Sequence, residues 1–405
     1  MDGLILSGLV AIFALTLLVT RQQRGVTPGM YRAYFMIGGS ALLTLAYVPN
    51  VWLQLLIAYL LVNALRDRML GAHLSRLYPM VVLVMAGALI LPSLTHEHIP
   101  ILLGAMALGG CVLAVQAAFY AYERRTIKGV WSVALTAGQE NVNNTQSISV
   151  VCGCAAIGLA VQYSPWWWPV AAVALSPMLF TTWVDWATHR AVTMGPVLLV
   201  GVGLMALPLW IGWWSAFLVP VVLVGLALAV MQAFRREHWW DSGRIRCWYT
   251  MLLTGWWLHG WTVRLCGRGW QSWLSYNDFI IDVARKTNRQ HIVNTRFMMS
   301  TAHNEFVQTL FEHGAIGLVL LCGYVLTALW QLGHSEGQAV YIAAVAMCGV
   351  ACTLHPWTWT HGTLSEVDEK GNPVKDGSGM KLYTIGSPAL NWLAFMLALL
   401  VEVAR

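Results

Sequence analysis

Long apolar stretches alternate with short polar loops along most of this chain. An apolar run of roughly 17–25 residues is long enough to cross a bilayer as a helix. The pattern predicts about twelve such membrane-spanning helices. They are expected near residues 3–20, 32–48, 50–66, 77–95, 99–121, 147–163, 167–185, 192–209, 212–232, 304–330, 338–354 and 386–403. We therefore expect an all-α, polytopic integral membrane protein in which residues 1–405 form a single membrane domain.

Two polar segments are too hydrophilic to lie in lipid. Residues 233–302 are rich in Arg and Trp and contain helix-like patches at 249–258 and 278–286. Residues 355–388 carry carboxylates and a Gly-rich turn. With twelve helices, these loops follow the ninth and the eleventh helix, so both lie on the same side of the membrane. We expect the first of them to fold over that membrane face as a small cap.

Composition agrees with a membrane protein. Hydrophobic residues make up 58% of the chain and charged residues 10%, whereas soluble domains carry about 25% charged residues. The first apolar run is followed by Arg21 and Arg24 without a small-residue cleavage site, so we interpret it as a permanent helix and not as a signal peptide. The eight cysteines form no zinc or disulfide pattern. No metal ion or other cofactor is expected.

Positive charge gathers on one side of the predicted membrane domain. The formal net charge is +6. Even-numbered short loops contain no Lys or Arg, whereas the odd-numbered loops carry Arg21, Arg24, Arg32, Arg66, Arg68, Arg76, Arg124, Arg125, Lys128 and Arg190. Anionic headgroups or an anionic lipid-linked substrate would suit this basic face better than nucleic acid. The positive-inside rule, taken alone, would place the basic face in the cytoplasm.

A histidine and an asparagine stand side by side where the cap segment ends and the apolar run 304–330 begins. If Thr301 caps that helix, His303 occupies its first turn. The helix dipole there would keep the imidazole neutral and able to act as a general base. Farther along, Gly314 and Gly317 would allow close approach of a helix or a lipid chain. The alternative for His303 is an interfacial side chain hydrogen-bonded to a loop.

The stretch that begins at this histidine resembles the signature of the O-antigen ligase and O-antigen polymerase family of membrane glycosyltransferases. The family pattern reads His-Asn, an apolar residue three positions after the His, and then Glu-x-Gly-x-x-Gly-Leu. The matching residues here are His303, Asn304, Phe306, Glu312, Gly314, Gly317 and Leu318.

Further elements resemble the same family and occur in its order. They are an Asn-rich turn that opens a helix, an arginine at the end of a helix, a Ser-Gly-Arg-x-x-x-Trp motif and a Gly-x-Gly segment. The matching residues are Gly138, Asn141, Asn143 and Asn144, then Arg190, then Ser242, Gly243, Arg244 and Trp248, then Gly267 and Gly269. His189 precedes the arginine where the family usually has Ser. The resemblance covers roughly residues 138–318.

The resemblance implies transfer of a saccharide from an undecaprenyl-diphosphate carrier to an acceptor hydroxyl, with inversion and without a metal ion. His303 would take the proton of the acceptor hydroxyl. Arg190 and Arg244 would hold the diphosphate through forked hydrogen bonds, and Asn304 would contact substrate. Neighbouring cations that could help bind donor or acceptor are Arg246, Arg264 and Arg268. The resemblance also implies a bacterial inner-membrane protein with both polar loops and the active face in the periplasm, opposite to the positive-inside rule.

Several alternatives stay open at this point. The acceptor would be lipid A-core for a ligase and another carrier-linked saccharide for a polymerase, while protein-glycosylating relatives are usually longer. A transporter or channel would carry polar residues within its spans near the midplane. Here the predicted spans hold few ionisable residues, with Asp185 near one end. A chain that has lost activity and only binds the lipid carrier or a biosynthetic partner is a third alternative, although the retention of His303 and Arg244 speaks against it.

Overall fold

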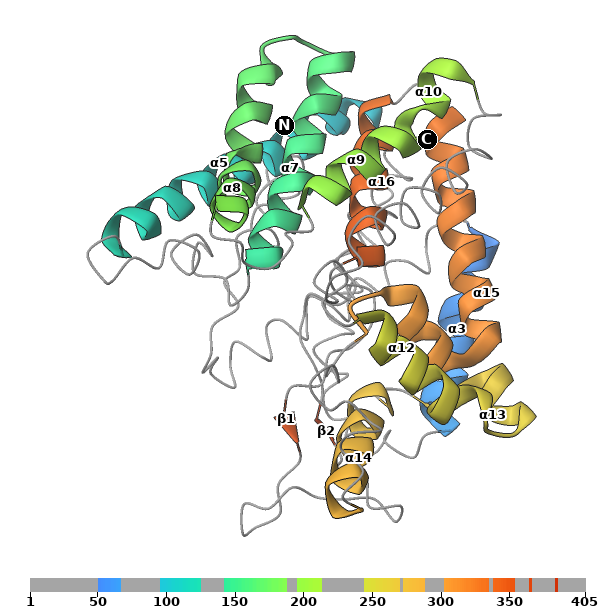
Figure 1. The fold of residues 1–405 in the computed structure, drawn as a ribbon. Coiled ribbons are helices and arrows are strands. Elements are labelled where there is room, and N and C mark those ends of the chain that lie inside the picture. The colour runs from blue at the N-terminus through green and yellow to red at the C-terminus, as the bar shows by residue number, and fades with distance from the viewer. Residues whose placement is uncertain are drawn as a thin grey trace.

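The computed structural model describes ten stretches of the chain: residues 50–66, 95–124, 142–187, 195–212, 244–269, 272–287, 302–334, 338–353, 364–365 and 383–384. The elements are α3 (Val51–Arg66), the 3-10 turn η3 (His96–His98), α5 (Ile99–Arg124), α7 (Val142–Gln162), α8 (Trp167–Ala187), α9 (Gly195–Ala206), α10 (Pro208–Ile211), α12 (Arg244–Leu252), the π-helical turn η4 (Leu253–Trp257), α13 (Trp261–Cys266), α14 (Ser272–Lys286), α15 (Glu305–His334), α16 (Gln338–Thr353), β1 (Leu364–Ser365) and β2 (Tyr383–Thr384) (Figure 1). The predicted spans 3–20, 32–48, 77–95, 212–232 and 386–403 lie wholly or almost wholly outside these stretches.

Predicted spans that fall within the described residues are helical. The runs at 50–66, 99–121, 147–163, 167–185 and 338–354 correspond to α3, α5, α7, α8 and α16. Among the described residues, α5, α7 and α15 are long and apolar enough to cross a membrane. The run at 192–209 is divided into α9 and α10, because Pro208 lacks the N–H that would continue the first helix.

Helices α5, α7, α8, α9 and α16 pack together as a bundle, at the upper left and centre of Figure 1. Small residues allow the backbones to approach closely. A Cβ at Gly158 of α7 would lie 2.6 Å from Cα of Ala339 in α16. A Cβ at Gly110 of α5 would lie 2.6 Å from the Cβ of Cys152 and 2.8 Å from that of Ala174. The bundle therefore depends on close van der Waals packing, as expected for helices in lipid.

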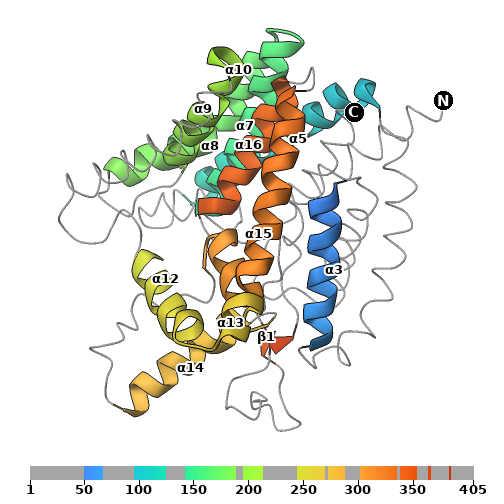
Figure 2. The ribbon, with the colours of Figure 1, turned by 90° about the vertical axis from the view of Figure 1, so that its right-hand side faces the viewer.

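Helix α3 lies antiparallel to α15, and polar contacts join the pair at both ends (Figure 2). At one end Asn50 Nδ2 donates to Thr327 Oγ1 at 2.9 Å. At the other end Asn63 Nδ2 lies 3.0 Å from His313 Nδ1, and the Tyr59 hydroxyl donates to the His313 carbonyl at 2.6 Å. These contacts fix the register of two helices that are far apart in the sequence.

Helix α15 is sharply bent at Gly314, which has φ 71° and ψ −169°. Only glycine adopts this backbone region readily. The Thr309 methyl lies 3.5 Å from the Cβ position of Gly317, although residues eight apart in a straight helix are separated by about 12 Å. The half before the bend therefore folds back beside the half after it. The prediction of one continuous span at 304–330 is wrong in this respect, because hydropathy does not detect a single-residue reversal.

The described parts of the predicted cap, namely α12, η4, α13 and α14, gather around this bend and are called the cap helices below (Figures 1 and 2). The helix-like patches predicted at 249–258 and 278–286 fall in α12–η4 and α14. Phe311 of α15 completes an aromatic core with Trp273 and Tyr276, at centroid distances of 5.1 and 5.7 Å. The half of α15 before the bend is thus as much a part of the cap core as of the membrane domain.

Strands β1 and β2 are the exception to the helical architecture of the described residues. They pair antiparallel, with Leu364 opposite Thr384 and Ser365 opposite Tyr383. Both lie in the predicted loop 355–388.

Candidate functional site

His303 lies immediately before α15 and not inside it. The helix begins at Glu305, and Asn304 caps it by accepting a hydrogen bond at Oδ1 from the Val307 amide at 3.0 Å. The φ of His303 is 50°, a left-handed backbone that residues other than glycine rarely adopt. The prediction that Thr301 is the cap and that His303 occupies the first turn is wrong. The asparagine side chain, a preferred N-cap, takes that position instead.

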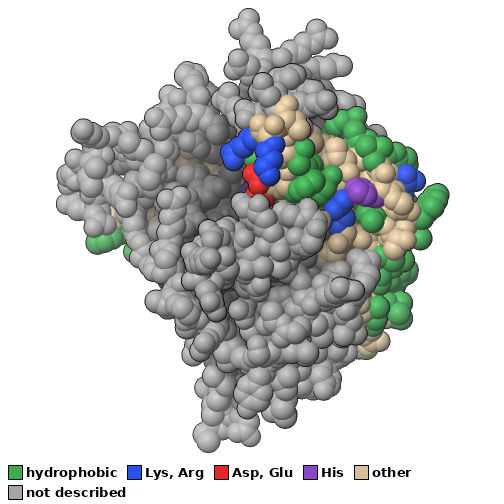
Figure 3. Space-filling view, turned by 90° about the horizontal axis from the view of Figure 1, so that it is seen from below, with side chains coloured by type: hydrophobic (Ala, Val, Ile, Leu, Met, Phe, Trp, Pro, Cys, Tyr) green, Lys and Arg blue, Asp and Glu red, His purple; other side chains and the backbone are tan. Residues whose placement is uncertain are grey.

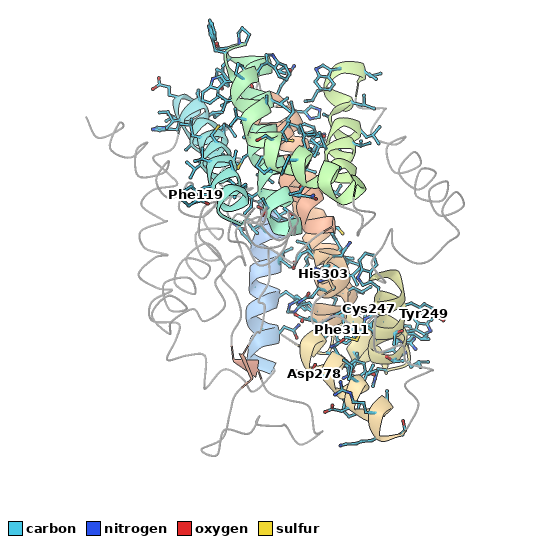
Figure 4. All side chains as sticks on the ribbon, turned by 60° about the vertical axis from the view of Figure 1, so that its left-hand side comes forward. Phe119, Cys247, Tyr249, Asp278, His303 and Phe311 are labelled. Atoms are coloured by element: carbon cyan, nitrogen blue, oxygen red, sulfur yellow. The ribbon has the colours of Figure 1, made fainter. Side chains whose placement is uncertain are left out.

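The peptide groups on either side of the buried Ala302 are held by two different elements. Figure 4 labels the neighbouring His303 together with Cys247 and Tyr249 of α12. Trp248 of α12 donates its indole N–H to the Ala302 carbonyl. Gln308 of α15 accepts the Ala302 amide at Oε1, at 3.4 Å. Together with the Asn304 cap, these bonds fix the backbone directly before and directly after His303. The unusual φ of the histidine is therefore enforced by its surroundings.

A second hydrogen bond connects this backbone to the cap helices. Gln308 Nε2 donates to Glu312 Oε1 at 3.2 Å, and the same oxygen accepts the backbone amide of Trp273 at 3.3 Å. Both side chains are buried. The glutamate of the motif thus links the start of α14 to the glutamine that holds the peptide before the histidine.

Two glycines from distant motifs meet at the bend of α15. Gly267 has φ 75° and Gly314 has φ 71°. A Cβ on Gly267 would overlap the Glu312 backbone, and a Cβ on Gly314 would overlap the Leu265 backbone. We call the contact between residues 267–269 and the bend the glycine junction. It requires glycine both for the backbone conformation and for the close approach.

The glycine junction also satisfies carbonyl groups that the bend removes from the helical hydrogen-bond pattern. The Arg268 amide donates to the Phe311 carbonyl at 3.1 Å, and the Gly269 amide donates to the Glu312 carbonyl at 2.9 Å. Helix ends leave such carbonyls without intrahelical partners. The Gly-x-Gly segment and the Glu-x-Gly-x-x-Gly segment therefore form one structural unit.

Arg244 begins α12 one turn before Trp248, so positions 244 and 248 share one face of that helix. Because Trp248 bonds to the residue before His303, the middle of α12 is tied to the backbone next to the histidine. Arg246 is two positions farther along α12 and on a different side of it. Arg190 lies outside the described residues.

The guanidinium group of Arg268 contacts a backbone carbonyl, a histidine and a tyrosine ring of this chain. Its Nε donates to the Gly255 carbonyl at 2.6 Å, and its guanidinium carbon lies 4.1 Å from the centre of the Tyr276 ring. Its Nη2 lies 2.6 Å from His259 Nε2. Since a guanidinium can only donate, this ring nitrogen must accept, which requires a neutral imidazole. Burial and the neighbouring Arg268 charge both lower the pKa of His259 from its usual value.

Arg264 lies on α13 among exposed aromatic side chains. Its Nε donates to the Trp257 carbonyl at 2.9 Å, and its guanidinium carbon lies 4.7 Å from the Trp257 ring and 5.2 Å from the Trp261 ring. Arg264 and Arg268 both adjoin the glycine junction and not the start of α15. A role of either arginine in substrate binding stays a prediction.

The contacts of α3 with the bend were not predicted from the sequence. Asn63 contacts His313 and also donates to the Cys266 carbonyl at 3.1 Å, so one amide touches both α15 and α13. The signal available was a single asparagine within an apolar run, a position at which polar residues are rare and usually have a specific role.

Comparisons of the chain with family models, with curated proteins and with solved structures found no match. Among the described residues, no group of three or more His, Cys, Asp or Glu side chains is arranged to hold a metal ion. The candidate site is therefore defined by its own geometry: a histidine with a fixed backbone before a capped helix, tied to a second helix that begins with an arginine.

Proposed function

We propose that this chain is a membrane glycosyltransferase of the O-antigen ligase type. It would move a saccharide from an undecaprenyl-diphosphate carrier to a hydroxyl of lipid A-core at the periplasmic face of a bacterial inner membrane. The observation that carries the proposal is the fixed position of His303, between the bonds to Ala302 and the Asn304 cap, with α12 tied to the same backbone through Trp248. Helices long enough to cross a membrane suit a donor that is itself a lipid.

The proposed step is a single displacement. In its neutral form, the imidazole of His303 accepts the proton of the acceptor hydroxyl while that oxygen forms a bond to the anomeric carbon. The bond from the anomeric carbon to the diphosphate oxygen breaks, and its electron pair leaves with undecaprenyl diphosphate. Attack opposite the leaving group inverts the anomeric configuration. General-base catalysis of this kind contributes about 10²- to 10⁴-fold in rate.

Arginines stabilise the leaving group in this proposal. Negative charge grows on the diphosphate as the bond breaks, and guanidinium groups bind phosphate oxygens through two parallel hydrogen bonds. We assign this role to Arg244, at the start of α12, and to Arg190. Two such cations can supply the charge that a divalent metal supplies in other glycosyltransferases. Asn304 would contact the saccharide next to the histidine.

Donor turnover by the purified chain tests the proposal. The protein in detergent receives undecaprenyl-diphosphate-linked oligosaccharide, with rough lipopolysaccharide in one reaction and additional donor in another. A lipopolysaccharide ladder that is insensitive to EDTA is expected for a ligase. Longer carrier-linked chains formed without lipopolysaccharide would instead identify a polymerase, which shares the donor and differs in the acceptor.

Three variants test whether turnover depends on the candidate site. His303→Ala is expected to lower turnover at least 100-fold, in line with the loss of a general base, and Arg244→Ala to lower it by a similar factor. His334→Ala, at the opposite end of α15 and exposed, is the matched control and should turn over donor at the rate of the unmodified chain. Full activity of His303→Ala, or no turnover of any donor, would contradict the proposal and favour a lipid-binding protein or a transporter.

A further inference from the structure

An exposed aromatic surface lies on one flank of the cap helices. Trp257, Leu258, Trp261 and Leu265 are 53, 69, 72 and 45% exposed. They come from the end of η4 and from α13, and we call them the α13 patch. Figure 3 shows hydrophobic side chains along one edge of the described surface, with Lys or Arg side chains beside them. An exposed apolar patch of this kind usually marks a site of contact with a membrane or another protein.

The position of this patch follows from the bend in α15. The half of α15 after Gly314 ends at His334 and is about 30 Å long at 1.5 Å per residue, which equals the thickness of a bilayer hydrocarbon core. All the exposed large hydrophobic side chains of α15 lie in that half. They are Ile316, Val319, Leu326 and Trp330. The half before Gly314 has none, so the lipid-facing part of the helix ends at the bend.

Helix α13 is attached at the level of this bend. The Leu265 backbone contacts Gly314, and the Cys266 carbonyl accepts a hydrogen bond from Asn63 of α3. The patch therefore lies where the hydrocarbon core of the membrane would end and the headgroups would begin.

The chemistry of the patch matches that boundary. Trp rings have an apolar body and a polar N–H, and they are enriched at the headgroup level of membranes. Arg264 lies over the rings of Trp257 and Trp261, while its Nε is bonded to the Trp257 carbonyl. This arrangement holds a positive charge between two aromatic rings, where it can meet a lipid phosphate.

We propose that the α13 patch lies on the bilayer surface of this chain's own membrane. The two tryptophan rings would rest at the boundary between headgroups and acyl chains, and Arg264 would face the lipid phosphates. The patch would thereby hold the cap helices against the membrane and keep α12 tied to the backbone next to His303. The inference depends on the membrane location of α15 and not on the proposed catalytic activity.

Fluorine NMR of the full chain tests this placement. The protein is labelled with 5-fluorotryptophan and placed in nanodiscs of phosphatidylethanolamine and phosphatidylglycerol. Trp257→Phe and Trp261→Phe each remove one resonance and so assign it, while both residues remain aromatic. Lipid with a nitroxide at carbon 5 of the acyl chain is expected to broaden both resonances at least threefold more than an aqueous gadolinium chelate does. Trp330, exposed near the other end of α15, is the lipid-facing control.

Each alternative result overturns the inference. Stronger broadening by the gadolinium chelate would place the patch in water. Broadening by neither reagent, with Trp330 still broadened by the lipid, would mean that protein covers the patch, for example a second copy of the chain. A further variant tests the charge. Arg264→Glu should reduce the lipid-induced broadening of the Trp261 resonance at least twofold, because a carboxylate is repelled by phosphates, and an unchanged value would remove Arg264 from the contact.

Discussion

The bundle of α5, α7, α8, α9 and α16 and the cap helices around the bend of α15 are held together in different ways. The bundle has an apolar core and closely approaching backbones at small residues such as Gly158. The cap helices are joined to α15 by backbone amides at Arg268 and Gly269, by the side chain of Glu312, which accepts the Trp273 amide, and by the indole N–H of Trp248, which bonds to Ala302. The apolar core of the bundle tolerates volume-conserving substitutions, whereas the hydrogen bonds of the cap need particular donors and acceptors. Close approaches that admit only glycine occur in both regions, at Gly158 in the bundle and at Gly314 beside the cap helices.

The largest effect on stability is expected at the glycine junction. Gly314→Ala forces a Cβ into the Leu265 backbone and a side chain into a glycine-only conformation. We expect a loss of at least about 3 kcal/mol in the free energy of unfolding, measured by unfolding in mixed detergent and SDS. In the bundle, Gly201→Ala has open space around the new Cβ and should gain up to about 1 kcal/mol from helix propensity. Equal effects at the two sites would contradict the close approach and the glycine-only backbone at Gly314.

Buried hydrogen bonds offer a second comparison. Gln308→Leu removes the bonds to Ala302 and Glu312, and Thr181→Val in the bundle removes the acceptor of Gln146 Nε2, which is 2.7 Å away. Each should cost about 1–3 kcal/mol of stability. Only Gln308→Leu should also lower kcat, by about tenfold with KM little changed, because it frees the peptide before the histidine. Equal kcat values for the two variants would show that Gln308 has a purely structural role.

Two helix caps allow a finer comparison. Asn304 caps α15, and Asn50 caps α3 by accepting the amides of Trp52 and Leu53 at Oδ1. Asn304→Ala and Asn50→Ala should each lower stability by about 1 kcal/mol. Turnover should fall only for Asn304→Ala, and Asn304→Ser, which retains a capping oxygen, should restore the stability. If Asn304→Ser recovers stability without turnover, the asparagine amide itself contacts substrate.

The smallest effect concerns pH. The folded cap lowers the pKa of His259, so the unfolded chain binds more protons over the range between the folded value and the usual value of about 6.5. Stability is therefore fully present above pH 6.5 and is partly lost as the pH falls through the folded pKa. His259 is partly exposed, so melting curves at pH 7 and 5 should differ by only about 1 °C from this group. His259→Gln should remove this 1 °C part of the difference in melting temperature between pH 7 and 5. If the variant has the same pH dependence as the unmodified chain, His259 is not its source.

Within the described residues, hydropathy was sufficient to locate the long apolar helices but not to predict where they bend. The runs at 50–66 and 338–354 became α3 and α16 almost residue for residue, since both are continuous apolar stretches. The run at 304–330 was interpreted as one span because a window average does not register the φ of a single glycine. The reversal at Gly314 depends on partners at Leu265 and Gly267 that lie far away in the sequence.

The sequence motifs identified candidate residues but not their arrangement. The motif pattern singled out His303 and the glycines, and the structure brings Gly267 and Gly314 together. The motif pattern did not reveal that Asn304 takes the cap position, because Thr301 is also a common N-cap residue type. Nor could it show that Arg268 binds a carbonyl of its own chain, since a surface cation and a partly buried one look alike in sequence.

The pairing of α3 with α15 has a consequence for the order of synthesis. Asn50 and Asn63 bond to Thr327 and His313, which follow them by 277 and 250 residues. At a ribosomal rate of about 5–20 residues per second, α3 is complete for more than about ten seconds before α15 exists. During that interval its asparagines cannot make their final contacts. The insertion machinery therefore has to retain α3, or give it temporary partners, until the later helix arrives.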